Sequence, residues 1–131
     1  MDKCELCLPT VYPIVWENSK FRIIEVDDSS YSAYYRVEHI QHIKEMTDLD
    51  ESDRNELMKA VFIVESAIKI FYTPDKINLA SLGNLTPHVH WHVIPRFYDD
   101  DHFPDSIWSQ QKKFKKTEIS DQIRKKINAF I

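Results

Sequence analysis

Three histidines, His88, His90 and His92, stand at alternate positions within a stretch that is otherwise apolar. A row of imidazoles supports three chemistries. It can ligate a catalytic zinc ion that keeps one position for water, attack an electrophile with a neighbouring acid or phosphate clamp, or bind an anion. Ligands of one zinc ion must bring their nitrogens to roughly 3.3 Å from one another. Three residues along one strand achieve that convergence with difficulty.

Nucleophilic attack needs no such convergence. An imidazole with an ordinary pKa of about 6.5 is largely uncharged at neutral pH and can attack phosphorus. A neighbouring imidazole that stays charged could then serve the leaving group.

The spacing of Cys4 and Cys7 indicates a second site. Two residues between two cysteines are typical of zinc-binding thiolates, but two thiolates do not complete a tetrahedral site, so two histidines would have to complete it. A reduced pair without a metal and a redox motif are the other interpretations. No thioredoxin-like βαβ pattern follows the pair, which disfavours the redox motif.

Two neighbouring strands are predicted to position the histidines. Their alternation with Val89, Trp91 and Val93 predicts a strand over residues 87–96, with the imidazoles on one face and the apolar side chains on the other. A strand over residues 77–82 and a turn at Gly83 and Asn84 precede it, which predicts an antiparallel hairpin. Further strands are expected over residues 15–17, 21–26 and 34–40.

One long helix is predicted over residues 51–71, with Asp50 as its capping residue and Pro74 just beyond its end. A second helix is expected over residues 118–130. Strands on either side of one long helix predict an α+β fold, with an antiparallel sheet of about five strands and a C-terminal helix. The long helix has an apolar stripe that should pack on the sheet: Leu57, Ala60, Val61, Val64, Ala67, Ile68 and Phe71.

Length and charge limit the class of protein. The 131 residues fit one domain, residues 1–131, in which residues 111–131 form a basic helical tail. This tail has seven basic and two acidic residues, a net charge of +5, which leaves −9 on the other 110 residues. Such an acidic body argues against sequence-independent DNA binding. The apolar runs are too short to span a membrane and no leader pattern opens the chain, so we expect a cytoplasmic protein with reduced cysteines.

Residues 88–94 match the motif His-φ-His-φ-His-φ-φ, where φ is an apolar residue. The chain therefore resembles the histidine triad (HIT) family of nucleotide hydrolases and transferases. Pro95 and Arg96 continue the motif as in many bacterial members and in the dinucleoside polyphosphate hydrolases of the family. The likeness covers roughly residues 4–108 and is strongest to a bacterial zinc-bearing subgroup. Other residues that carry it follow in the family's order: Cys4, Cys7, His42, Asn78 and Gly83.

The resemblance implies a covalent mechanism. His90, the middle histidine, would attack the α-phosphorus and form a nucleotidyl-histidine intermediate, which water or another acceptor then resolves. His92 would hydrogen-bond the phosphate oxygens or the leaving group. His88 would orient the row or ligate a structural metal. Two displacement steps take the place of a single attack by water, and each step has a lower barrier than the single attack.

The resemblance also implies a nucleotide-binding role for residues before the triad. Asn78 matches the family's asparagine that contacts ribose and phosphate, and Gly83 and Asn84 match a Gly-Gln pair that faces the phosphates. Leu85 stands where many members have Ser or Thr, and Thr86 follows one place later. This departure alters the expected phosphate donor and leaves the leaving-group preference open, whereas the nucleophile is unaffected.

The two histidines that a metal site would need are also implied by the resemblance. In zinc-bearing members, the histidine before the long helix and the first triad histidine complete a Cys₂His₂ site. We therefore expect a structural zinc ion bound by Cys4, Cys7, His42 and His88, with His39 as the competing ligand.

These features together predict a hydrolase that attacks the α-phosphate of dinucleoside polyphosphates or nucleoside phosphoramidates, with a purine nucleotide as substrate. By resemblance it would be a homodimer, without an organic cofactor and without a membrane or sequence-specific nucleic-acid partner. The alternatives are a nucleotide-binding sensor or interaction module with little turnover, a nucleotidyl transferase, and a zinc hydrolase that uses all three triad histidines as ligands.

Overall fold

The computed structural model describes residues 4–110 and 116–129 of the chain. Five strands, two α-helices and two short 3-10 helices make up this part. In chain order they are η1 (Glu5–Cys7), β1 (Ile14–Glu17), β2 (Phe21–Glu25), β3 (Tyr35–His39), η2 (Met46–Asp48), α1 (Glu51–Tyr72), β4 (Lys76–Ala80), β5 (His90–Arg96) and α2 (Lys116–Asn128).

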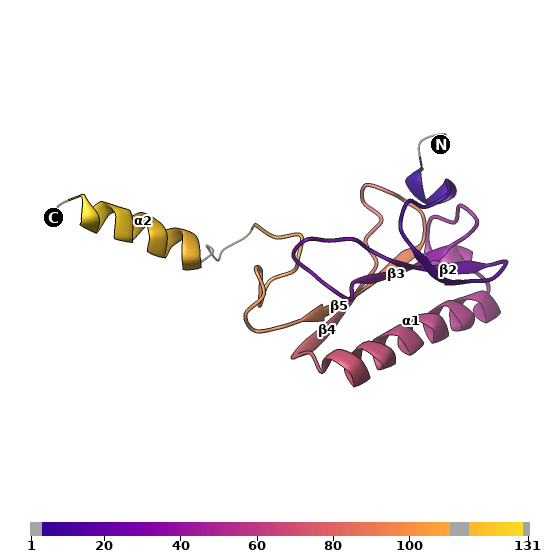
Figure 1. The fold of residues 1–131 in the computed structure, drawn as a ribbon. Helices are drawn as coiled ribbons and strands as arrows, with labels where there is room; N and C mark the ends of the chain where they lie inside the picture. Colours follow the sequence, from indigo (N-terminus) through magenta and orange to yellow (C-terminus); the bar gives the residue numbers. More distant parts are fainter. Residues whose placement is uncertain (1–3, 111–115, 130–131) are drawn as a thin grey trace. The chain divides into compact units, whose positions relative to one another are not determined.

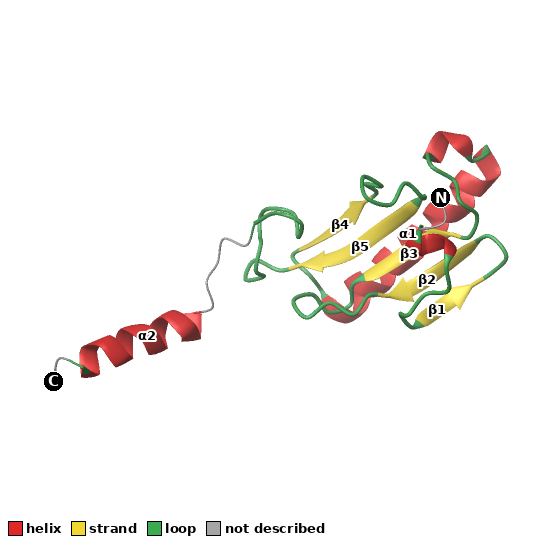
Figure 2. Ribbon diagram, turned by 90° about the horizontal axis from the view of Figure 1, so that it is seen from above, coloured by secondary structure: helices red, strands yellow, loops and turns green. Residues whose placement is uncertain are grey.

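The five strands form one antiparallel sheet in the order β1-β2-β3-β5-β4 (Figure 2). β5, which carries two of the triad histidines, lies between β3 and β4 and is therefore held by hydrogen bonds on both edges. α1 covers one face of the sheet, and the N-terminal segment, residues 4–13, passes over the other face (Figure 1). The predicted α+β fold is confirmed.

The main core lies between α1 and the sheet. α1 begins after Asp50, whose carboxylate accepts a hydrogen bond from the backbone N–H of Asp53 at 2.8 Å. Most of the predicted apolar stripe is buried, but Ala67 and Phe71 are exposed. The buried core consists of Phe21, Ile23, Val37, Leu49, Leu57, Ala60, Val61, Val64, Ile68, Ile77, Val89 and Val93.

The hairpin that carries the triad differs from the predicted tight turn, because residues 81–89 form a longer loop between β4 and β5. The N–H of His88 donates to the carbonyl of Thr86 at 2.8 Å, and the N–H of Val89 donates to the carbonyl of Ile43 at 2.7 Å. Neither residue therefore takes part in the β4 pairing. The strand consequently begins at His90 and not at residue 87 or 88.

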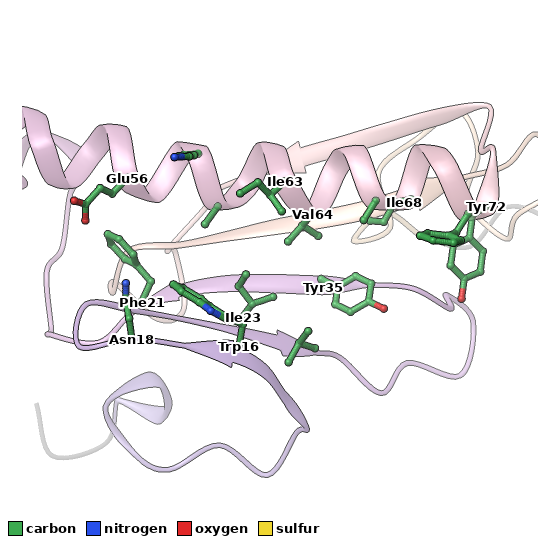
Figure 3. A pocket seen from close by; sticks show the side chains of 15 residues that line it. Trp16, Asn18, Phe21, Ile23, Tyr35, Glu56, Ile63, Val64, Ile68 and Tyr72 are labelled. Carbon is green, nitrogen blue, oxygen red and sulfur yellow. The ribbon is translucent and has the colours of Figure 1, made fainter.

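A groove of about 1310 Å³ lies on the α1 side of the sheet, opposite the face that carries His90 and His92 (Figure 3). Trp16, Phe21 and Ile23 form its wall on the sheet, and Ile63 and Phe71 form its wall on α1. Ile63 and Phe71 are 58% and 80% exposed. The exposed part of the predicted stripe therefore lines this groove.

Residues 98–131 form a second compact unit. It contains α2, in which Ile123 and Ile127 are half exposed. Lys112, Lys113 and Lys115 of the predicted basic tail lie outside the described residues. The assignment of the whole chain to one domain stays a prediction. Within the described ranges, no helix combines the length and apolar character needed to cross a bilayer.

Candidate active site and metal cluster

His88 faces the two cysteines. Its ring is 1% exposed, and its Nε2 lies 2.6 Å from the carbonyl oxygen of His39. A carbonyl only accepts, so Nε2 carries the proton and Nδ1 keeps its lone pair. This Nδ1 lies 3.4 Å from Sγ of Cys4 and 3.5 Å from Sγ of Cys7. Because His88 precedes β5, the prediction that it is the first of three imidazoles on one strand face is wrong.

Cys4, Cys7, His42 and His88 form a cluster whose ligand atoms all lie within 4.8 Å of one another. The Sγ of Cys7 is 3.3 Å from Nδ1 of His42. Two sulfurs and two imidazole nitrogens match the donor set of a tetrahedral structural zinc site. Burial raises the pKa of the Cys7 thiol, and the neighbouring Cys4 raises it further. A divalent cation would favour both thiolates, so the residues fit a metal.

His39, the competing candidate, lies outside this cluster. Its ring packs edge-on against Phe21, with centroids 5.5 Å apart, and its Nδ1 accepts from the N–H of Gln41 at 3.1 Å. Its backbone carbonyl fixes the tautomer of His88. The geometry therefore favours His42 as the ligand and gives His39 a supporting role.

His90 is the first residue of β5, and its hydrogen bond defines its tautomer. Its Nδ1 lies 2.6 Å from the carbonyl oxygen of His88, so Nδ1 carries the proton and Nε2 has the lone pair. Burial lowers the pKa of His90, which keeps the ring uncharged at neutral pH. An uncharged imidazole with its lone pair on Nε2 is the state that a nucleophile requires.

The contact of His92 with Tyr34 fits the opposite tautomer. The Oη of Tyr34 lies 2.5 Å from Nδ1 of His92, and both residues are buried. Burial raises the pKa of Tyr34, so the hydroxyl keeps its proton and is able to donate it to Nδ1. A ring that accepts this proton on Nδ1 carries its own proton on Nε2. The rings of His90 and His92 are 4.9 Å apart between centroids, at 79°. One ring offers a lone pair and its neighbour an N–H group.

Burial, together with the charges of His90 and Arg36, lowers the pKa of His92 to about 3. The expectation of a charged imidazole beside the nucleophile therefore does not hold in the protein without substrate. The ring is buried beside a tyrosine, where the charged form loses its hydration. His92 is therefore uncharged at neutral pH and does not supply positive charge to this face of the sheet.

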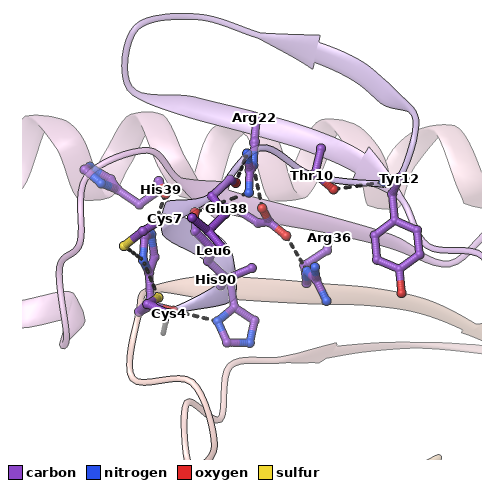
Figure 4. A network of polar contacts seen from close by, with 12 residues as sticks. Cys4, Leu6, Cys7, Thr10, Tyr12, Arg22, Arg36, Glu38, His39 and His90 are labelled. Atoms are coloured by element: carbon purple, nitrogen blue, oxygen red, sulfur yellow. Dashed lines mark hydrogen bonds and ion pairs between the residues drawn. The ribbon is translucent and has the colours of Figure 1, made fainter. Parts of the chain in front are cut away.

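An ionic trio, Arg22, Glu38 and Arg36, lies beside the triad (Figure 4). Glu38 is fully buried on β3. The Nε of Arg22 lies 2.6 Å from its Oε1, and the Nε of Arg36 binds its Oε2. Arg22 also donates to the carbonyls of Leu6 and Leu8, both at 3.2 Å. The trio thus joins the segment with the cysteines to the strand beside the histidines.

The sequence contains a signal for this trio that the analysis of apolar residues missed. Arg36 and Glu38 alternate with Val37 and His39 inside a predicted strand. Charged residues at alternate positions normally mark a solvated face, whereas here the N-terminal segment covers that face. The contact of Tyr34 has no local signal in the sequence, because its partner His92 is 58 residues away.

Asn78 lies on the sheet face of His92, because β4 pairs it with Ile94 on β5. Its side-chain oxygen accepts from Nη1 of Arg96 at 2.7 Å. Arg96 is 1% exposed, and its guanidinium lies 5.7 Å from the ring centre of Tyr31. The amide oxygen is thus held by Arg96, and the amide NH₂ is the group that Asn78 could offer to a nucleotide.

Gly83, Asn84 and Thr86 lie in the loop before β5. Gly83 has a φ of 71°, in the left-handed region that favours glycine. The carbonyl of Thr86 accepts the N–H of His88 at 2.8 Å, so this end of the loop is attached to the triad backbone. Asn84 is exposed. Their predicted role in phosphate binding stays a prediction.

Residues 12–99 match the model of the HIT domain family. No curated protein sequence matches the chain. A solved histidine triad protein from Bradyrhizobium japonicum is 28% identical, with 86% of each chain covered and a TM-score of 0.69. A HIT family protein from Bacillus anthracis shares the fold at 20% identity, with 99% of this chain and 98% of that chain covered and a TM-score of 0.69.

A hypothetical histidine triad nucleotide-binding protein from Sulfolobus tokodaii is 25% identical, with 86% of this chain and 78% of that chain covered and a TM-score of 0.56. The residues that match the family model include all five strands, α1 and the triad. Proteins of this family bind nucleotides and are generally hydrolases or transferases. The chain belongs to the histidine triad (HIT) family.

Proposed function

We propose that the protein is a nucleotide hydrolase that cleaves the bond between an α-phosphate and its leaving group through a nucleotidyl-histidine intermediate on His90. The observation that supports this proposal is the pair of Nδ1 contacts: the carbonyl of His88 at Nδ1 of His90 leaves a lone pair on Nε2, and the hydroxyl of Tyr34 at Nδ1 of His92 fits an N–H on Nε2. Purine nucleotides are the proposed substrates, either dinucleoside polyphosphates or nucleoside phosphoramidates.

In the first step, Nε2 of His90 attacks the α-phosphorus. A P–N bond to His90 forms while the bond to the leaving group breaks, and the leaving group takes the bonding electrons. A polyphosphate leaves as the oxyanion, whereas the amine of a phosphoramidate also takes a proton from solvent. The positive charge that develops on the ring is stabilised by the hydrogen bond from Nδ1 to the carbonyl of His88. The N–H of His92 stabilises negative charge on the phosphoryl or leaving oxygen.

In the second step, water attacks the phosphorus and the P–N bond breaks. The electrons of that bond return to Nε2 of His90, the nucleoside monophosphate leaves, and one proton passes from the attacking water to solvent. Both steps use the same nitrogen, so one variant tests both.

The test is the intact mass of the protein after brief exposure to diadenosine tetraphosphate and quenching in denaturant without acid. We expect an adenylyl adduct on the wild type, none on His90→Ala, and an unchanged adduct on the control His102→Ala. Hydrolysis without an adduct, stopped at once by a chelator, would move the assignment to a metal-activated water. Binding of AMP without adduct or hydrolysis would make the protein a nucleotide sensor.

We also propose that the cluster of Cys4, Cys7, His42 and His88 binds a structural zinc ion. Support comes from the four converging ligand atoms and from the carbonyl that fixes His88 with Nδ1 towards the sulfurs. Metal analysis of the purified protein should give about one zinc per chain, and Cys7→Ser should lose it. A full complement of zinc in Cys7→Ser would contradict this site. Such thiolates suit the reducing cytoplasm that the sequence predicts.

We infer a homodimer that covers the outer side of α1. Phe62, Ile63, Ile70 and Phe71 are all more than half exposed on this helix. β4 is an edge strand, which is also suited to pairing with a second copy. Sedimentation should show a dimer for the wild type and a monomer for the double variant Phe62→Glu, Ile70→Glu. Lys69→Glu, on the same helix, is the control and should stay dimeric.

A further inference from the structure

We propose that Arg36 binds the phosphates beyond the scissile bond and makes the protein selective for substrates whose leaving group is an anionic polyphosphate. This inference rests on the proposed function and specifies its substrate class. It separates dinucleoside polyphosphates from nucleoside phosphoramidates.

The position of Arg36 is set by the register of the sheet. It stands directly opposite His92 in the pairing of β3 with β5, so its side chain starts on the face of the reacting histidines. The Cβ atoms of directly opposite residues are about 4.5–5.5 Å apart and those of diagonal neighbours about 7–8 Å apart. His90 is such a diagonal neighbour. From this position, the guanidinium of Arg36 can reach a phosphate chain that extends from the α-phosphorus.

Arg36 is held in place from one side. Its Nε binds Glu38, and its Cζ lies 5.7 Å from the centre of the Tyr12 ring (Figure 4). In the part of the chain that the structure describes, Nη1 and Nη2 make no hydrogen bond. The side chain is 20% exposed. A planar guanidinium fixed through Nε, with its two terminal groups open, is suited to bind phosphate oxygens in a bidentate manner.

The charges around the site favour an anion. Glu38 is shared by Arg22 and Arg36, so the trio carries a net positive charge. The histidines do not add to it, because burial lowers the pKa of His92 to about 3. Arg36 stands directly opposite His92 in the pairing of β3 with β5, and its charge contributes to the lowered pKa of His92. Arg36 is therefore the residue that can neutralise phosphates next to His92.

The neutral state of His92 also fits an anionic leaving group. Cleavage of a P–O bond to a polyphosphate releases an oxyanion, which needs charge neutralisation and no proton. Cleavage of a P–N bond to an amine requires that the nitrogen gain a proton as the bond breaks. With Nδ1 bonded to Tyr34, the Nε2–H of His92 is a hydrogen-bond donor and a poor acid. Arg36 and His92 together thus support departure of a polyphosphate.

The test compares kcat/KM for diadenosine tetraphosphate and for adenosine 5′-phosphoramidate. Loss of a bidentate, charge-assisted contact predicts that Arg36→Gln reduces kcat/KM for the tetraphosphate on the order of 100-fold and that for the phosphoramidate by less than about 5-fold. Arg36→Lys should lie between wild type and Arg36→Gln. Arg54→Gln, the same charge change on α1 across the sheet, is the control and should alter neither value.

A binding measurement tests Arg36 without turnover. In the His90→Ala background, calorimetry should show that adenosine 5′-tetraphosphate binds more tightly than AMP, and that Arg36→Gln removes this difference. Glu38 keeps Arg22 as its partner in Arg36→Gln, so the melting temperature should stay near that of the parent.

The role of Arg36 would be overturned if Arg36→Gln lost kcat/KM equally for both substrates, or if it still bound the tetraphosphate more tightly than AMP. The adenylyl adduct on His90 would persist in either case. Absence of that adduct with either substrate would instead overturn the proposed function, and the calorimetric comparison would still decide for or against Arg36.

Discussion

His88 and His90 are two residues apart, yet they belong to regions with different chemistry. His88 lies in the cluster with two cysteines, and His90 lies beside His92 at the start of β5. Each imidazole gives one nitrogen to a backbone carbonyl. His88 uses Nε2 for this bond and His90 uses Nδ1. The opposite nitrogen is Nδ1 in His88, which lies near the two cysteines, and Nε2 in His90, and we propose that the first binds a metal and the second attacks phosphorus.

The comparison shows that the role of a histidine in this motif is set by the carbonyl it contacts. The carbonyl for His88 comes from β3, and the carbonyl for His90 comes from His88 itself. The residue type and the spacing are the same in both cases. A motif of alternating histidines therefore predicts where imidazoles stand but not which nitrogen each one presents.

The largest expected effect separates the two regions directly. His90→Ala should lower kcat at least ~10³-fold, because the nucleophile is lost, while the melting temperature changes little. His88→Ala should lower the melting temperature and the zinc content together. Steady-state kinetics and thermal melts of both variants are the measurement. Loss of zinc in His90→Ala would contradict the separate roles of His88 and His90.

Metal removal should affect stability more than chemistry. A chelator that strips the cluster should lower the melting temperature by about 10 °C or more, since metal binding adds directly to folding free energy. The rate per folded molecule at low temperature should change much less. Immediate loss of activity with an intact fold would show instead that the metal takes part in the reaction.

Acid should destabilise the protein through His92. Its pKa is lowered from 6.5 to about 3, so below pH 6.5 the unfolded chain binds a proton at His92 that the folded chain does not bind. The contribution of His92 to the free energy of unfolding is fully present above pH 6.5 and is lost as the pH falls towards 3. About 2 kcal/mol of it is lost between pH 7 and pH 5. Chemical denaturation of wild type and His92→Gln at both pH values isolates this contribution. Equal pH dependence in the two proteins would refute it.

The smallest expected effect concerns the tautomer of His92. Tyr34→Phe removes one hydrogen-bond donor to Nδ1, so kcat should fall by about 5- to 10-fold. Nitrogen NMR of the His92 ring should show that the proton no longer resides on Nε2 alone. Tyr35→Phe, at the next position but on the α1 face, is the control and should leave both readouts unchanged.

Much of the fold follows from local patterns. All five strands and α1 occur close to their predicted ranges, because alternation and helical spacing each act over a few residues. The start of β5 was placed too early. Its position depends on the hydrogen bond from Val89 to Ile43, a partner far away in sequence. No local pattern contains that bond.

In the site, too, some features could be predicted from the sequence and others depend on contacts between distant residues. The cysteine spacing and the family resemblance together place Cys4, Cys7, His42 and His88 as candidate ligands, and these four residues converge in the structure. The trio of Arg22, Glu38 and Arg36 and the bond of Tyr34 to His92 were not predicted. They depend on strand register and on the N-terminal segment that covers the sheet, and neither can be derived from one sequence without the fold.

Arg22 has a thermodynamic consequence for the whole molecule. It holds the carbonyls of Leu6 and Leu8, between and just after the two cysteines, and it also shares Glu38 with Arg36. Metal occupancy should therefore change the affinity for polyphosphate through Arg22. Linkage then requires that polyphosphate change the affinity for the metal by the same factor. Zinc titrations with and without adenosine 5′-tetraphosphate measure this factor, and Arg22→Gln should bring it to one.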